Sequence, residues 1–221
     1  MLKTAVTSEN SAENRFLHLY KMVQERENFL NTDAKVVQYS AILRFFMKFL
    51  QQNETYTSNV SSVLFWTYVK LGDIYYDDGL QNQDNTRYFL AVEYYNQALS
   101  YARTPEDKSR VLLALKDIYY YVNDEDALIR VEETWAENHN KEEKFAAYML
   151  LAGNAESPLV KARFLEKALD EVMGQDENFY AKYQDTLNIC SQLLAIYELQ
   201  GEKEKAIRIK KLRENTLKLL N

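Results

Sequence analysis

A short hexapeptide recurs along this chain at long, nearly regular intervals. Leu71-Gly72-Asp73-Ile74-Tyr75-Tyr76 is followed 44 residues later by Leu115-Lys116-Asp117-Ile118-Tyr119-Tyr120. A shorter echo of five residues, Leu193-Leu194-Ala195-Ile196-Tyr197, begins 78 residues after the second copy, which is two steps of 39. Repeats of about 34 to 45 residues are typical of solenoids, in which each supersecondary unit packs only on its neighbours. The repeat therefore favours a solenoid over a single bundle.

The hydrophobic pattern between the copies is helical. Val36, Ser40, Leu43, Met47 and Leu50 recur every three or four residues, as on one face of a helix. The chain has only 5 Gly and 2 Pro among 221 residues, too few for the frequent turns of an all-β fold. We expect about ten helices, at residues 11–31, 33–52, 58–78, 86–103, 105–122, 124–138, 141–154, 157–173, 177–200 and 202–220. Short connections predict antiparallel neighbours, and so an all-α solenoid of helix pairs.

Several residues are suited to begin or end these helices. Thr104-Pro105 and Ser157-Pro158 each put a capping oxygen before a proline, which is tolerated in the first turn because its missing N–H has no helical partner there. Asp33 is predicted to cap the second helix, and Gly79 to end the third. The stretch from Leu80 to Thr86 is polar and predicts a loop. Gly174 and Gly201 stand where two later helices are expected to stop.

Around the first copy the spacing resembles the tetratricopeptide repeat (TPR) family. Tyr68, Leu71, Gly72, Tyr75 and Gly79 match the first helix of that motif, and Ala91, Tyr95 and Ala98 match its second helix after an insertion of seven residues. Further units follow at Leu112, Leu115, Tyr119, Asn123, Ala127 and Val131; at Phe145, Tyr148, Ala152, Leu165 and Ala168; and at Cys190, Leu193, Tyr197, Gly201 and Ala206. The resemblance covers about residues 60–220 and implies a right-handed α-solenoid.

The motif has a physical basis in helix packing. Gly72, Ala91 and Ala98 are small enough to let helices approach closely, and large tyrosine rings fill the space between pairs. We expect residues 56–221 to form one continuous domain of TPR-like repeats. Residues 1–55 form a separate N-terminal helix pair that matches no motif, and they are interpreted as a divergent repeat, a cap or a segment that folds over the binding face.

The first helix of each unit carries a second face. It bears Val69, Asp73, Tyr76 and Asp77 in one unit, and Leu113, Asp117, Tyr120 and Tyr121 in the next. These positions follow the spacing i, i+4, i+7 and i+8, which keeps them on one side of a helix. The TPR resemblance implies that this side lines a concave groove for a protein or peptide partner. Tyrosine beside aspartate favours a basic or N–H-rich ligand, and disfavours the family's carboxylate-gripping variant. The alternative is that the tyrosines pack between helices and the aspartates are solvated.

Charge and composition exclude several other functions. The formal net charge of −6 disfavours general binding to nucleic acid or to anionic membranes. The most apolar run, Tyr39 to Leu50, is too short to span a bilayer. The N-terminus has no secretory signal, and the lone Cys190 fits a reducing compartment, so we expect a cytoplasmic protein.

Catalytic residues are not recognisable in the sequence. His18 and His139 have no nucleophile or acid at a suggestive spacing, and Cys190 is expected on the packing side of its helix. No phosphate-binding glycine loop, cofactor motif or metal-ligand pattern is present in the sequence. The sequence therefore predicts a protein that is not an enzyme and uses no cofactor.

The predicted function is non-catalytic binding of a protein or peptide, as a scaffold, adaptor or chaperone. Alternatives are a dedicated chaperone for an exported protein and a module that self-associates into homo-oligomers; an all-α enzyme is disfavoured. One charge asymmetry remains. Between Glu202 and Lys218 there are seven basic and three acidic residues. This segment is either a solvated helix that caps the solenoid or a surface for an acidic partner, including a second copy of the chain.

Overall fold

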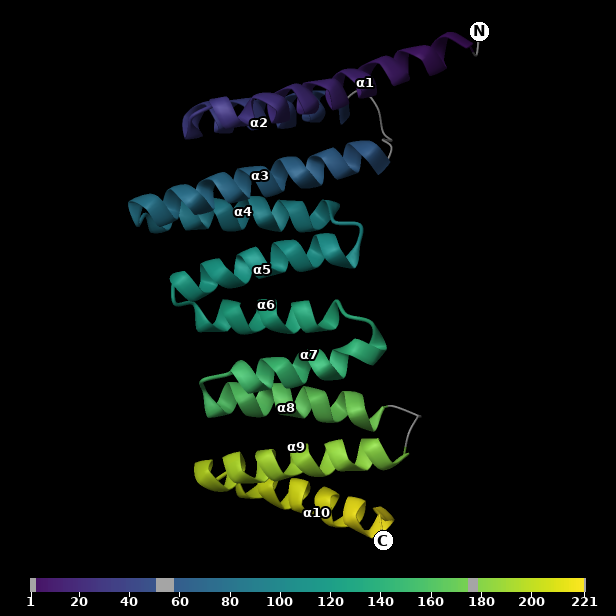
Figure 1. Cartoon of the computed structure of the whole chain (residues 1–221), viewed down its shortest axis with the longest axis vertical. Coiled ribbons are helices and arrows are strands. Elements are labelled where there is room, and N and C mark those ends of the chain that lie inside the picture. The colour runs from purple at the N-terminus through teal and green to yellow at the C-terminus, as the bar shows by residue number, and fades with distance from the viewer. Residues whose placement is uncertain (1–2, 51–57, 175–178, 221) are drawn as a thin grey trace. The chain divides into compact units, whose positions relative to one another are not determined.

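The computed structural model of the chain is all-α (Figure 1). It describes residues 3–50, 58–174 and 179–220, and within them it contains ten α-helices and no strand. The helices are α1 Lys3–Arg26, α2 Thr32–Leu50, α3 Ser58–Asn82, α4 Asn85–Tyr101, α5 Pro105–Tyr121, α6 Glu125–Glu137, α7 Lys141–Asn154, α8 Pro158–Met173, α9 Phe179–Gln200 and α10 Lys203–Leu220. A 3₁₀ turn, η1 Glu27–Phe29, follows α1. The all-α prediction and its number of helices are confirmed.

The chain divides into two compact units, residues 1–128 and 129–221, and the division falls within α6. In the first unit, α1 and α2 both pack on α3, which packs on α4, and α4 packs on α5. In the second unit, α7 packs on α8, α8 on α9 and α9 on α10. Neighbouring helices thus pack in chain order, as expected for an α-solenoid. The predicted boundary near residue 55 lies outside the described residues.

The predicted loop after Gly79 is wrong. Helix α3 continues to Asn82, and α4 begins at Asn85, so the seven-residue insertion lengthens both helices. Gly79 serves as a close contact rather than a helix stop, because a Cβ there would lie 3.0 Å from Cε1 of Tyr88. The turn instead uses Gln83, whose φ is 53°, and Asp84, whose carboxylate accepts a hydrogen bond from the N–H of Thr86 at 2.9 Å.

The starts of the helices agree with the prediction in part. Asn31, not Asp33, caps α2: its Oδ1 accepts a hydrogen bond from the N–H of Ala34 at 2.9 Å. The Thr104 cap is present as a full capping box with Asp107. Ser157 also precedes a helix as predicted, but its side chain makes no capping hydrogen bond.

The close approach of α3 and α4 depends on Gly72. A Cβ at Gly72 would lie 2.6 Å from Cε1 of the Tyr95 ring, nearer than real carbon contacts allow. Ala91 and Ala98, on the same side of α4 as Tyr95, are fully buried. The predicted close approach of helices at small residues is confirmed, and the ring that meets Gly72 belongs to Tyr95 of the same helix pair.

A buried tyrosine links three successive helices in the first unit. Tyr95 of α4 donates a hydrogen bond to Oδ1 of Asp73 in α3 at 2.7 Å. The second oxygen of Asp73 accepts one from Nη2 of Arg110 in α5 at 3.4 Å. We call this set, a carboxylate, a tyrosine and a cation on three successive elements, the three-helix triad.

The second unit contains the triad twice. Tyr148 of α7 donates to Glu137 of α6 at 3.1 Å, and Lys167 of α8 lies 3.5 Å from the same carboxylate oxygen. Further along the chain, Tyr197 of α9 donates to Glu166 of α8 at 2.7 Å, while Arg208 of α10 lies 3.3 Å from it. In each case the polar end of a buried ring is satisfied at the edge of the core.

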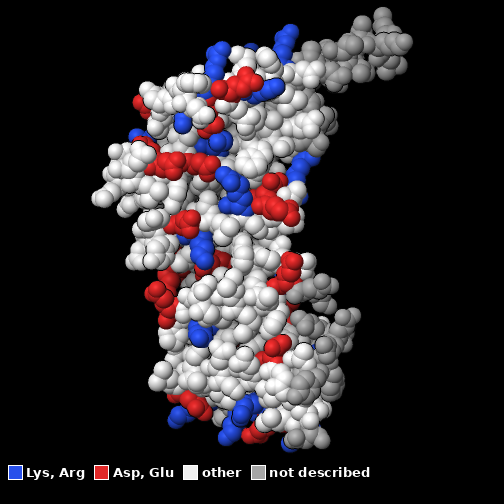
Figure 2. All heavy atoms as spheres, in the orientation of Figure 1, with Lys and Arg blue, Asp and Glu red and all other residues white. Residues whose placement is uncertain are grey.

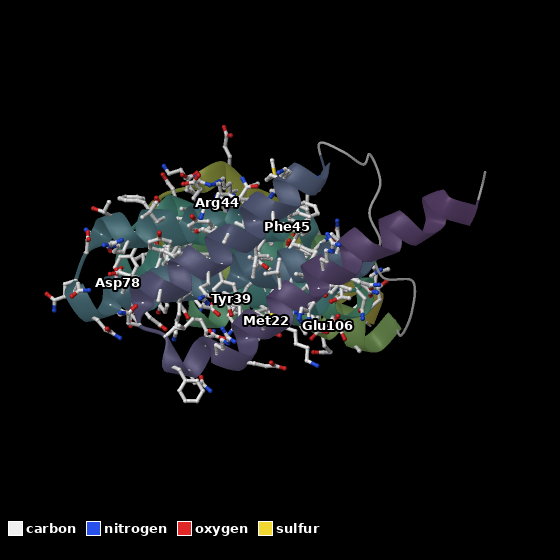
Figure 3. The ribbon with its side chains drawn as sticks, turned by 90° about the horizontal axis from the view of Figure 1, so that it is seen from above. Met22, Tyr39, Arg44, Phe45, Asp78 and Glu106 are labelled. Carbon is white, nitrogen blue, oxygen red and sulfur yellow. The ribbon has the colours of Figure 1, made fainter. Side chains whose placement is uncertain are left out.

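The N-terminal hairpin has a related arrangement. Glu27 of η1 pairs with Lys70 of α3 at 3.1 Å, and the fully buried Tyr39 of α2, labelled in Figure 3, stands near Glu27. Burial, followed by the Glu27 carboxylate, raises the pKa of Tyr39. The Tyr39 hydroxyl, however, lacks hydrogen-bond geometry to any described group. The carboxylate, tyrosine and cation of the triad are therefore all present in this hairpin, but the hydrogen bond from the tyrosine to the carboxylate is missing.

Candidate protein-binding surface

Sequence analysis predicted a binding face of eight residues on α3 and α5. The structure places two of them, Val69 and Asp73, in structural contacts and the other six at or near the surface. Val69 is 1% exposed, so it belongs to the core and its assignment to an exposed binding face is wrong. The reason is that α3 packs against α1, α2 and α4, which together cover its middle. Asp73 is half-buried and is engaged by Tyr95 and Arg110, which gives it a structural role.

Three of the remaining residues are tyrosines, and their rings form a series with Tyr88 that runs across three helices. Tyr121 of α5 stacks on Tyr88 of α4, with ring centroids 6.1 Å apart and planes only 6° from parallel. Tyr76 of α3 lies 6.0 Å from Tyr88 and 6.3 Å from Tyr121. Tyr120 meets the edge of Tyr121 at 6.3 Å. The rings thus extend from the buried Tyr88 out to the surface.

Sequence reasoning did not identify Tyr88 as part of this site. The helical spacing of the sequence could have indicated it, since Tyr88, Ala91 and Tyr95 lie three and four residues apart on one face of α4. Tyr88 was missed because the preceding residues were interpreted as a loop inserted into the motif.

The outer side of this cluster is exposed. Tyr120 is 70% exposed, Tyr121 55% and Leu113 49%, while Asp77 and Asp117 are also exposed. All four residues predicted for the face of α5 are accessible. We call this set the tyrosine–aspartate surface. Its members are Tyr76, Asp77, Leu113, Asp117, Tyr120 and Tyr121.

The two aspartates of the surface have no ion-pair partner within the described part of the chain. Neither Asp77 nor Asp117 forms a hydrogen bond or an ion pair through its side chain within the described part of the chain, whereas the adjacent Asp78 pairs with Arg87 at 2.9 Å. Figure 3 labels Asp78 near one end of the first unit. Desolvation, followed by repulsion from Asp73, raises the pKa of Asp77, and Lys35 opposes this shift from a greater distance than an ion pair.

The negative charge of the two aspartates also affects the hydroxyl of Tyr76. Burial, followed by the charge of Asp117, raises the pKa of Tyr76 to about 12, and Asp77 adds a smaller effect in the same direction. Both carboxylates therefore act on one tyrosine hydroxyl. The surface combines apolar ring area with negative potential, which is suited to binding a cation.

The other candidate residues are structural. Cys190 is fully buried, and burial raises the pKa of its thiol, which disfavours the reactive thiolate. The ring of His139 lies edge-on to Trp135 at 4.4 Å, and its Nδ1 lies 2.9 Å from the Trp135 carbonyl oxygen. Three or more potential metal-ligating side chains do not gather anywhere in the described residues. Nor does any helix there have the length and apolar character of a membrane span.

Helix α10 presents a basic outer face. Arg208 pairs with Glu166, and Lys205 lies over the ring of Tyr197 at 5.3 Å, so both face the rest of the second unit. Apart from Lys205, five exposed cations on α10 have no ion-pair partner among the described residues: Lys203, Lys210, Lys211, Arg213 and Lys218. Acidic and basic side chains are nevertheless interspersed over the face of the molecule seen in Figure 2. A polar outer face is what the terminal helix of a solenoid requires for solubility.

No protein-family model matches the chain, and a search of curated proteins finds no significant match. The class is therefore defined by the fold: an all-α protein of sequentially packed helical hairpins.

Proposed function

We propose that the protein is a non-catalytic binding module of TPR type, which acts as a scaffold, adaptor or chaperone for a protein or peptide partner. The tyrosine–aspartate surface contacts that partner. One observation carries the proposal: two largely exposed tyrosines, Tyr120 and Tyr121, are held in place by ring contacts that lead to the buried Tyr88. The spacing of Gly72 and Tyr95, with its close helix contact, supports the TPR assignment.

Preorganisation is the physical advantage of this surface. A flexible side chain loses about 0.5–1.5 kcal/mol of conformational freedom when a partner immobilises it. The stacking of Tyr121 on Tyr88 restricts the Tyr121 ring before any partner arrives. Tyrosine also offers a large apolar area and a polar hydroxyl with few rotatable bonds, which is why it is frequent in interface hot spots.

The non-catalytic part of the proposal rests on the kind of groups present. Catalysis of acid–base or nucleophilic type needs titratable groups in mutual contact around a reacting atom. The tyrosine–aspartate surface instead offers rings and two exposed carboxylates. A module of this kind uses no cofactor, and we place it in the cytoplasm because its lone Cys190 fits a reducing compartment.

Site-specific crosslinking tests the proposed surface. A photoreactive phenylalanine analogue replaces Leu113 on the surface or, as a matched control, Leu150 in the second unit, which is 55% exposed. Crosslinking in the native cell extract is expected to join specific proteins to the Leu113 variant and not to the Leu150 variant. The Tyr120→Ala/Tyr121→Ala double variant is expected to lose those products while its circular dichroism and melting temperature stay close to wild type. Identical products from both positions, or products that persist in the double variant, would contradict the proposal.

A further inference from the structure

The first unit contains two arginines that show how it holds a cation. Arg87 lies over the ring of Tyr75, 5.8 Å from its centroid, and pairs with Asp78 at 2.9 Å. Arg110 lies over the ring of Trp66 at 5.3 Å and pairs with Asp73 at 3.4 Å. Each guanidinium therefore contacts an aromatic face and a carboxylate at the same time. The same combination occurs twice within one unit.

The tyrosine–aspartate surface has the other two parts of this arrangement. It presents exposed rings, Tyr120 and Tyr121, with Asp117 one turn away on the same helix. Asp77 follows Tyr76 in α3, and its charge acts on the Tyr76 hydroxyl. Both nearby arginines are committed to other carboxylates, and Lys35 forms no ion pair with Asp77. A ring and a carboxylate are present, and no described residue places a cation within ion-pair distance of Asp77 or Asp117.

We propose that this surface recognises an arginine side chain in a basic segment of the partner protein, with the guanidinium held between Asp77, Asp117 and the exposed tyrosine rings. This inference rests on the proposed function and adds the chemistry of the ligand. Arginine suits the site better than lysine, because its planar group stacks on a ring while its N–H groups pair with carboxylates. The aliphatic part of the side chain covers Leu113 and the ring faces.

Charge complementarity distinguishes this ligand from the others. Two carboxylates without an ion-pair partner repel phosphate groups, so nucleic acid and anionic lipid are poor ligands for this face. A second copy of the chain offers exposed cations on its basic α10 helix and elsewhere, as at Arg44 and Arg130, so self-association is an outcome of the test below. The exposed cations on α10 are mainly lysines, which lack the planar group that occupies the two internal arginine sites.

A random peptide library identifies the ligand chemistry directly. Phage-displayed peptides of about 12 residues, long enough for an extended segment, are selected on the full-length protein. We expect the selected sequences to be enriched in arginine. For the best synthetic peptide, measured by fluorescence anisotropy, replacing its arginine by neutral, nearly isosteric citrulline is expected to weaken binding by about tenfold or more. Lysine at that position is expected to give an intermediate loss.

Variants of the protein complete the test. Asp77→Asn/Asp117→Asn is expected to lose the preference for arginine over citrulline, whereas the control Asp170→Asn, an exposed aspartate of α8, keeps it. If peptides bind through Tyr120 and Tyr121 but arginine and citrulline bind equally, the arginine proposal is wrong and the proposed function stands. If no selected peptide depends on those tyrosines, the proposed function is wrong as well.

Two further results would identify a different ligand. Selection of acidic peptides would overturn the arginine proposal outright. Concentration-dependent sedimentation that is abolished by Lys210→Glu/Lys211→Glu and by Asp77→Asn/Asp117→Asn would show that a second copy occupies the surface. A single monomeric species across the concentration range is the expected result.

Discussion

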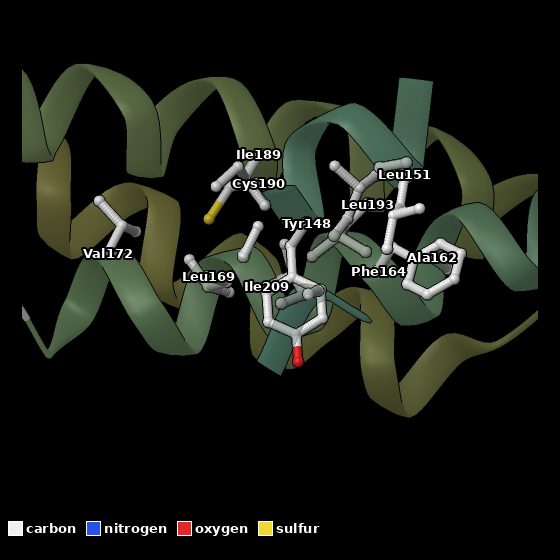
Figure 4. Packing of buried hydrophobic residues seen from close by; sticks show 14 of the residues in the cluster. Tyr148, Leu151, Ala162, Phe164, Leu169, Val172, Ile189, Cys190, Leu193 and Ile209 are labelled. Carbon is white, nitrogen blue, oxygen red and sulfur yellow. The ribbon is translucent and has the colours of Figure 1, made fainter. Parts of the chain in front are cut away.

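The two units fill their cores with different side chains. In the first unit, Phe16 lies 5.5 Å from Phe46, Tyr20 lies 6.5 Å from Tyr39, and further ring pairs follow along α3 and α4. The core of the second unit is mainly aliphatic, and Figure 4 shows Tyr148 among leucine, isoleucine and valine side chains with its hydroxyl pointing away from them. Both units nevertheless contain the three-helix triad. The hydrogen bond and ion pair of the triad recur in both units, whereas the core side chains change from aromatic to mainly aliphatic.

This difference accounts for where the candidate surface lies. A series of rings can continue from the core to the exterior, because each ring offers a face or an edge to the next. In the first unit that series ends at Tyr120 and Tyr121. The exposed apolar side chains of the second unit, such as Leu159 and Leu199, have no comparable ring support. In the first unit, aromatic packing therefore contributes to stability and also supplies a preorganised surface.

The largest expected effect is at the aromatic contact between α3 and α4. Gly72→Leu places a side chain where a Cβ alone would already lie 2.6 Å from Tyr95. Overpacking of this kind costs about 1–3 kcal/mol of unfolding free energy. The matched control is Gly153→Leu in α7, because nothing lies within 4 Å of a Cβ built there. Removing a helical glycine at that open position is expected to stabilise by about 0.5–1 kcal/mol.

Urea or thermal unfolding of the two glycine variants measures this contrast. Opposite signs are expected, a loss for the first unit and a gain for the second. Equal effects would show that the α3–α4 contact is looser than described and would remove the packing argument for the motif.

The next largest effects concern the triads. Tyr95→Phe, Tyr148→Phe and Tyr197→Phe each remove a hydroxyl that donates to a carboxylate, and each is expected to cost about 1–2 kcal/mol. Tyr39→Phe removes a buried hydroxyl that has no hydrogen bond among the described groups. That change is expected to be neutral or slightly stabilising, because it eliminates an unsatisfied polar atom.

Chemical denaturation of the four phenylalanine variants tests whether the triad is a common element. Similar losses at Tyr95 and Tyr148 would show that the link contributes equally to an aromatic and an aliphatic core. A loss at Tyr39 as large as the others would mean that its hydroxyl is bonded to Glu27 in solution, which would make the N-terminal hairpin a full repeat.

Sequence patterns predicted the fold well and the site only in part. The recurring hexapeptide and the helical periodicity gave the ten helices, because both depend on local spacing. Gly79 was misjudged because glycine ends a helix in one context and admits a neighbouring ring in another, and only the position of Tyr88 decides between them. Val69 was misjudged because spacing assigns a face without showing which helices cover it.

The three-helix triads could not be predicted for a related reason. Their members lie 22 residues apart for Tyr95 and Asp73, 11 for Tyr148 and Glu137, and 31 for Tyr197 and Glu166. Helix and loop lengths vary between repeats, so no fixed interval marks these pairs. The buried tyrosines are recognisable as core residues, but their partners are set by how three helices pack.

The smallest predicted effect is at Asp77, where stability and binding are expected to change in opposite directions. The pKa of this carboxyl is raised above its ordinary value of 3.8, so the folded state holds the proton more tightly than the unfolded state. Ionisation of Asp77 therefore lowers stability as the pH rises through that range. Asp77→Asn removes this penalty and is expected to stabilise by no more than about 0.5 kcal/mol, because the side chain is exposed and screened.

The pH dependence and a second-unit control make this prediction specific. The gain from Asp77→Asn is expected at neutral pH and low salt, and it shrinks below pH 3.8, where the wild-type carboxyl is also protonated. Glu133→Gln should lose stability instead, because Glu133 pairs with Arg163 at 2.7 Å. Melting temperatures across pH and salt measure both. A loss at Asp77 that resembles the loss at Glu133 would mean that Asp77 has a partner in the folded protein, and an arginine ligand would then have to displace it.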